Sequence, residues 1–322
     1  MISGETKIAA VATEIQDLAP TISELAQRAR MVATSASIAK LEGRGRAELL
    51  LPCEIGAEAL ERCKILVTNN VVVLETLGVI SLTRYVFELL VWLRTIKQTP
   101  LKSLYFLMLS LNDGEAHTAQ HIEQLKAEAS FFDMMAERDD PVPAMRALQE
   151  QHGENLTAEI VRAAEKSRMG AIDLEARRHF SVYAADAKIN GYSFQAHLIR
   201  TKAIIAAEAD LKAHWRARTE LVDRFGQALI NESGIGSKWI WANSAKAVGM
   251  EAEYEYIYRY TSRLLHATPT SFYTSAKNLE LVEMRVFLEF VYVRLLDVID
   301  VVAELIDRAE TNLVAHPDPL SA

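Results

Sequence analysis

The sequence predicts an all-α protein, a multi-helix bundle of long antiparallel helices preceded by an N-terminal helical arm. Among 322 residues only 13 are Gly and 8 are Pro, where average usage would give roughly 22 and 16. Ala and Leu, which are strong helix formers, contribute 45 and 37 residues. A β-sandwich or β-barrel needs a turn about every 8–12 residues, and this chain lacks the turn residues for one.

The overall composition describes a globular protein with an ample core. Half of the residues are hydrophobic and 24% are charged, so we expect one large domain or two smaller ones. The net charge of −8 argues against a broad nucleic-acid-coating surface but is compatible with a local basic cleft. Cys53 and Cys63 are too few for a disulfide framework or a cysteine zinc site, which fits a reducing cytoplasm.

The first fifty residues are expected to form the helical arm. Thr21 and Glu24 have capping-box spacing just after Pro20, which favours a helix start there. Two glycines and two arginines at 43–46 predict a flexible basic link, and Pro52 shortly after it is expected to delimit a helix. We therefore place the arm at 1–50 and the main helical bundle at 51–322, with a sub-boundary near 139–143.

The remaining helices are predicted between the proline and glycine positions. Residues 54–98 have helical apolar spacing, with an expected buried stripe that includes Leu77, Tyr85 and Trp92. A helix from 101 should break at 112–114, and another should run over 116–137 before the breakpoint at 138–143. Several helices follow over 144–232, then helices at 239–248 and 251–267. The last helix, at 278–313, is apolar almost all round and should be central.

The two most apolar stretches, 65–93 and 286–306, are each interrupted by charged residues. Charges near the centre of a bilayer are costly, so these stretches are expected to be core helices, with no membrane partner. The first residues also lack a basic segment followed by an apolar one, so no secretory signal is expected.

Several kinds of site are excluded by residue patterns. The chain has no Walker-type phosphate loop and no Gly-x-Gly-x-x-Gly. None of the eight histidines follows a Glu or Asp by three positions, which rules out the paired Glu-x-x-His of di-iron bundles. His117 and His121 would share a helical face but lack the zincin glutamate, so a solvated or hydrogen-bonded pair is favoured over a metal site. We expect no metal and no cofactor.

The first stretch that stands out contains Arg84 and Glu88, four residues apart in an apolar helix. Such groups can pair on one helix face, and buried charges need partners. One interpretation is a structural ion pair, extended to Glu289, Arg285 or Arg294 of the last helix. The alternative is a functional site, because perturbed buried groups cluster at such sites.

The second stretch is the predicted helix at 251–267. At about 100° per residue one face carries five residues, which are Tyr254, Ile257, Tyr258, Thr261 and Leu265. Another face carries Glu255, Arg259, Ser262, Arg263 and His266. His266 lies shortly before Pro269, at an expected helix end where the helix dipole favours its protonated form. A face with arginines, a serine and a histidine can hold a phosphate and transfer a proton.

These two stretches carry a resemblance. Two motifs, the Arg-x-x-x-Glu at Arg84–Glu88 and the Tyr-x-x-x-Tyr-x-x-x-Ser-x-x-x-His that runs from Tyr254 to His266, resemble an uncharacterised family of bacterial all-helical proteins, over roughly residues 60–310. The likeness implies an all-helical fold and carries no function with it.

A looser resemblance is to the HEPN superfamily (higher eukaryotes and prokaryotes nucleotide-binding), whose nucleases are dimerising helical bundles that cleave RNA without metal. Their Arg is followed by four to six residues and then His, and Arg259 and His266 have that spacing. The resemblance implies that Arg259 holds the scissile phosphate and His266 acts in acid–base transfer. Tyr260 departs from the polar residue usual after that Arg, and the same spacing also occurs at Arg146–His152.

Two functions follow as hypotheses. The first is a HEPN-like, metal-independent, RNA-targeting effector of the toxin or phage-defence kind, an endoribonuclease with catalytic His266 and Arg259. Its binding residues are Arg263, Ser262, Tyr258, Arg84 and Glu88. The second is a non-catalytic helical interaction subunit of a larger complex, in which Arg259 pairs with Glu255 and His266 is a helix-end cation. We expect a cytoplasmic protein with RNA as a partner in the first case, and a homo-oligomer or a protein partner in either.

Overall fold

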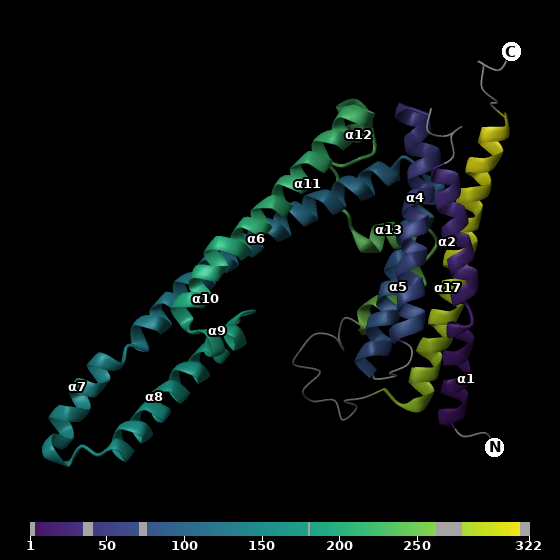
Figure 1. Ribbon diagram of the computed structural model, residues 1–322. Coiled ribbons are helices and arrows are strands. Elements are labelled where there is room, and N and C mark those ends of the chain that lie inside the picture. The colour runs from purple at the N-terminus through teal and green to yellow at the C-terminus, as the bar shows by residue number, and fades with distance from the viewer. Residues whose placement is uncertain (1–3, 35–40, 71–75, 180, 262–278, 316–322) are drawn as a thin grey trace. The chain divides into compact units, whose positions relative to one another are not determined.

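The computed structural model describes residues 4–34, 41–70, 76–179, 181–261 and 279–315, and within these ranges every regular element is a helix (Figure 1). The all-α prediction is confirmed. The chain forms two compact units, the first from residues 1–109 and 221–322 and the second from residues 110–220.

The first unit is built around the last helix, α17 (Leu281–Ala315). The helices that pack around it are α1 (Gly4–Gln16), α2 (Ala19–Thr34), α4 (Gly43–Ile65) and α5 (Thr76–Gln98). Along α17 the fully buried residues include Leu288, Val291, Val298, Val302 and Ile306. The predicted central helix at 278–313 is thus confirmed within three residues at each end.

Helix direction in this unit differs in part from the prediction. Helix α4 is antiparallel to α17, because Cys53 lies against Leu305 and Gly56, three residues later, lies against Val302. Helix α5 is parallel to α17, since Arg94 pairs with Asp297 while Lys97, further along α5, pairs with Glu304. Only helices joined by a short loop must be antiparallel neighbours, and α5 and α17 are far apart in the chain.

The residues expected to form an N-terminal arm are part of the core. Ile15, Ile22, Ala26 and Ala29 are fully buried in the same cluster as α4, α5 and α17. The basic residues 43–46, expected as a flexible link, form the first turn of α4. The observed units therefore differ from the expected division at 50/51, and the expected sub-boundary near 139–143 lies inside the second unit.

Two expected helix breaks are absent. Pro52 is buried inside α4. Helix α6 (Lys102–Arg138) runs without interruption through residues 112–114. A Cβ added at Gly114 would lie 2.8 Å from the Cε1 atom of His214, so this glycine permits close packing of α6 against α11 (Ile204–Phe225) and does not end a helix.

The face of α5 that is buried also differs from the predicted one. Leu77 and Tyr85 are exposed and Trp92 is half-buried, while the buried face carries residues such as Ile80, Phe87 and Leu90. Where nearly every position is apolar, the sequence does not identify which side faces the core. Helix α5 is also the one helix in the described ranges with the length and hydropathy of a membrane span, and half of that apolar window is buried within the protein.

The second unit is a smaller helical assembly with its own core. It contains the later part of α6, followed by α7 (Pro141–His152), α8 (Ala158–Arg178), α9 (Ala184–Asn190), α10 (Tyr192–Leu198) and most of α11. The predicted break at 138–143 is confirmed, since α6 ends at Arg138 and α7 begins at Pro141, where the Asp140 carboxylate accepts a hydrogen bond from the Val142 N–H. Phe132, Ala129 and Ala196 are fully buried in this core.

The connection back to α17 carries the second stretch singled out by the sequence. After α12 (Gln227–Glu232) and α13 (Trp241–Ala247), a helical run covers 251–261 and comprises α14 (Glu251–Glu253), the π-helical turn η4 (Tyr254–Tyr258) and one further turn. Ile257 and Thr261 are buried and Tyr254 and Tyr258 are half-buried, while Glu255 and Arg259 are exposed. The predicted division of this run into a core face and a polar face is confirmed for the described residues.

Candidate functional site

The two stretches that stand out in the sequence meet in the first unit. Arg84 on α5 donates a hydrogen bond from Nε to Oε1 of Glu88 at 2.8 Å and another from Nη2 to the hydroxyl of Tyr258 at 3.2 Å. Its guanidinium carbon also lies 4.6 Å from the centre of the Tyr258 ring. The structure therefore brings together residues that are 174 positions apart in the chain.

The guanidinium of Arg84 is held in place but is not sealed off. The side chains of Arg84 and Glu88 are 25% and 27% exposed, so the pair lies at the edge of the core and not in its interior. Glu88 sits one helical turn after Arg84 and fixes one edge of the guanidinium, and Tyr258 fixes another. Such a cation can still reach a phosphate oxygen presented from the solvent side.

Aromatic packing fixes Tyr258 in turn. Its ring stacks on Tyr254 at 4.8 Å between centroids and lies 6.4 Å from Phe87 and 6.3 Å from Trp241. Phe87 is fully buried on α5. Because aromatic pairs with this geometry are stabilising, the hydroxyl of Tyr258 is held at a fixed distance from Arg84.

The remaining predicted site residues are placed differently. Arg259 is 62% exposed and pairs with Glu255 at 3.0 Å, the i,i+4 ion pair that the structural interpretation expected. Ser262, Arg263 and His266 lie outside the described residues. Of the residues proposed from the sequence, the structure thus joins Arg84, Glu88 and Tyr258, with Arg259 on the exposed side of the same helical run.

The last helix contributes to a different ionic network from the expected one. Arg285 and Glu289 pair with each other at 2.7 Å. Arg294 pairs with Asp297 on its own helix and with Glu253 of α14 at 3.4 Å, and Asp297 also accepts a hydrogen bond from Arg94 of α5 at 3.2 Å. This network connects three of the elements that position the Arg84 cluster.

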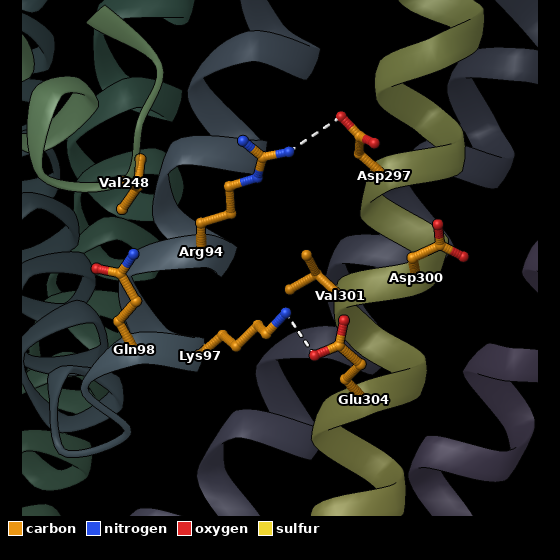
Figure 2. Close-up of a pocket in the computed structure, with 8 residues that line it drawn as sticks. All are labelled: Arg94, Lys97, Gln98, Val248, Asp297, Asp300, Val301 and Glu304. Carbon is orange, nitrogen blue, oxygen red and sulfur yellow. Dashed lines mark hydrogen bonds and ion pairs between the residues drawn. The ribbon is translucent and has the colours of Figure 1, made fainter.

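A hollow of about 360 Å³ lies beside this network, between α5 and α17 (Figure 2). Arg94 points across it to Asp297 and Lys97 to Glu304, while the carboxylate of Asp300 is turned away from both cations. Both cations are neutralised by facing carboxylates, so the hollow has little attraction for an anion. Its ion pairs connect α5 to α17 and thereby help to hold Arg84 in place.

No group of three or more His, Cys, Asp or Glu residues within the described part of the chain has the geometry of a metal site. His117 is exposed and His121 half-buried on α6. Cys53 and Cys63 are fully buried, and burial raises the pKa of both thiols to about 12, so neither is a reactive thiolate near neutral pH.

Comparison of the chain with protein-family models, with curated proteins and with solved structures gives no match.

Sequence reasoning did not identify the role of Arg94, Arg294 and Asp297. Their positions as charges in otherwise apolar helices were visible, but the pairing between α5 and α17 depends on the parallel direction of those helices. A second group of polar residues was also missed. It surrounds Lys102 at the start of α6.

Proposed function

We propose that the Arg84 cluster and the segment that follows Tyr258 form a metal-independent RNA-binding and RNA-cleaving site, of the kind the HEPN resemblance implies. The hydrogen bond between Arg84 and Tyr258 carries this proposal, because it joins the two stretches whose residue patterns pointed to a site in the sequence. His266 is the histidine nearest to Tyr258 in the sequence.

The chemistry follows from the residue types. His266 takes the proton of a ribose 2′-hydroxyl, and the 2′-oxygen forms a bond to phosphorus while the bond from phosphorus to the 5′-oxygen breaks. The imidazolium then returns the proton to the departing 5′-oxygen, which leaves a cyclic phosphate. Arg259 and Arg263 hold the non-bridging phosphate oxygens, and Arg84 binds the phosphate of a neighbouring nucleotide.

The test is cleavage of single-stranded RNA by the full chain in EDTA. Wild type should cleave RNA but not DNA of the same sequence, because DNA lacks the 2′-hydroxyl. His266→Ala should lower the rate by at least about a hundredfold, the usual contribution of general acid–base catalysis. His152→Ala is the matched control, since Arg146 and His152 share the Arg–His spacing, and it should cleave normally. A wild type that neither cleaves nor binds RNA, or a His266→Ala variant as active as wild type, would overturn the proposal.

A second candidate function is supported by the surface of α17. Val282, Val286 and Val293 are 73%, 54% and 46% exposed, and Tyr256 of η4 is 63% exposed. The spacing of the three valines, four and seven residues, places them on one face of α17, and exposed apolar side chains on one face favour a protein partner or self-association. This alternative, a non-catalytic interaction subunit, gains support if light scattering after size-exclusion chromatography shows an oligomer that Val286→Glu dissociates while RNA is neither bound nor cleaved.

A further inference from the structure

A second hollow in the first unit has the opposite charge character to the one between α5 and α17. It measures about 320 Å³ and lies between the end of α5, the start of α6 and residues 237–248, which include α13. Its walls contain Lys102 and Lys238 but neither Asp nor Glu. Its volume falls in the range of small-molecule sites, about 300–1,000 Å³.

The ammonium of Lys102 is half-buried without a carboxylate partner among the described residues. Its Nζ donates a hydrogen bond to the carbonyl oxygen of Ser233 at 2.7 Å and lies 4.7 Å from the centre of the Tyr105 ring. Burial lowers its pKa. A neutral carbonyl and a ring compensate a buried cation less than an anion does, so an anion in the hollow would be bound favourably.

The surrounding loop is shaped around this ammonium. Gly234 has a φ of +90°, and a Cβ added there would lie 2.6 Å from the Lys102 Nζ. Any other residue at this position would both strain the backbone and displace the lysine. Tyr105 donates its hydroxyl hydrogen to the carbonyl of Ser237 at 3.1 Å, which holds the other end of the same loop. These contacts hold the Lys102 side chain in one position against the loop.

The other walls supply an apolar surface and unused polar groups. Trp239 lines the hollow and stacks on Trp92 at 3.6 Å between centroids, so its ring is rigidly held. Gln98 and Asn243 also line it, and neither side chain makes a hydrogen bond among the described residues. A rigid aromatic wall, amide groups and two ammonium groups suit a ligand that has a flat ring and a negative charge.

We propose that this hollow binds a small organic anion with a flat ring and one phosphate or carboxylate group, of the size of a mononucleotide. The charged group contacts Lys102 and Lys238, and the ring lies against the wall formed by Trp239. The site is separate from the Arg84 cluster and does not depend on the proposed cleavage of RNA.

The test is calorimetric titration of the full chain with four probes at millimolar concentrations. Adenosine monophosphate combines ring and phosphate, benzoate combines ring and carboxylate, adenosine has a ring without charge, and inorganic phosphate has charge without a ring. We expect one of the first two to bind at least about tenfold more tightly than both of the last two. The tighter of the first two identifies whether phosphate or carboxylate is preferred.

Two variants and one control decide whether the lysines are responsible. Lys102→Gln and Lys238→Gln should each weaken binding by about tenfold. Lys246→Gln, on α13 but outside the lining and paired with Glu251, should bind as wild type does. Because Lys102 also holds the loop, circular dichroism must show that Lys102→Gln is folded. If Lys102→Gln does not fold, the exposed Lys238 provides the test through Lys238→Gln. Absence of binding by every probe, or equal weakening in all three variants, overturns the proposal.

Discussion

The contact between Arg84 and Tyr258 makes the most informative prediction, because it joins the two stretches on which the proposed site depends. The hydrogen bond is long, at 3.2 Å, and a quarter of the arginine side chain is exposed, so we place it at the low end of the usual 0.5–1.5 kcal/mol, about 0.5 kcal/mol. The ring contact at 4.6 Å adds about 0.5–1 kcal/mol. Together they predict a coupling free energy of about 1–1.5 kcal/mol.

A double-mutant cycle measures this coupling directly. Arg84→Met and Tyr258→Leu are made singly and together, and the cycle cancels every other contact of either side chain, including that of Arg84 with Glu88. Tyr258→Phe in the same cycle keeps the ring and should leave only the hydroxyl contribution, about 0.5 kcal/mol.

Urea unfolding followed by tryptophan fluorescence is the assay. The chain has four tryptophans, of which Trp215 lies in the second unit and is 44% exposed. A Trp215→Phe background therefore makes the fluorescence report on the first unit alone. Glu255 and Arg259 form a matched control pair on the exposed side of the same helical run, with an expected coupling of at most about 0.5 kcal/mol. A coupling below about 0.3 kcal/mol for Arg84 with Tyr258 would refute the contact.

Further predictions concern packing and buried thiols. Gly56→Ala should destabilise the first unit by about 1 kcal/mol in urea unfolding, because the new Cβ would lie 3.0 Å from Cγ1 of the fully buried Val302. The cost of overpacking, about 1–3 kcal/mol, exceeds the gain in helix propensity from replacing a glycine. A stabilised variant would contradict this. Gly170→Ala has nothing within 4 Å and should instead stabilise α8 by about 0.5–1 kcal/mol, measured as a higher melting temperature of the second unit. Cys53 and Cys63 should resist alkylation at neutral pH until the protein is unfolded, and a labelled thiol in the folded chain would disprove their burial. Burial raises the pKa of both thiols from 9.0 to about 12, so between these pH values the folded state binds more protons than the unfolded state. The contribution of the two thiols to the free energy of unfolding is therefore complete below pH 9 and is lost as the pH rises towards 12.

The prolines and glycines expected to interrupt helices do so at some positions and not at others. Pro141 lies in the expected breakpoint at 138–143 and begins α7, because its missing N–H is tolerated in the first turn. Pro52 lies inside α4 although an interior proline costs about 3 kcal/mol, since the residues on both sides of it, Leu51 and Cys53, are buried in the core. Gly114 is likewise inside α6, where it admits the His214 ring.

The candidate site was predictable in its parts but not in its assembly. Arg84 and Glu88 could be paired from their spacing, and Tyr258 could be assigned to the core face of its helix from periodicity. Their contact could not be predicted, because it depends on how α5 and η4 pack. The ion pair between Arg94 and Asp297 has the same cause, as it requires α5 to run parallel to α17.

The sequence by itself determined that this protein is helical, that the helical pattern breaks at 138–143, and that the last helix is the central one. Those features depend on local propensity and on apolar content, which each segment carries with it. Only the tertiary structure decided which glycines and prolines interrupt a helix, which side of α5 is buried, and that Arg84 meets Tyr258. A proline or glycine inside a helix costs at most a few kcal/mol, and the free energy gained by burying a whole helix face is larger.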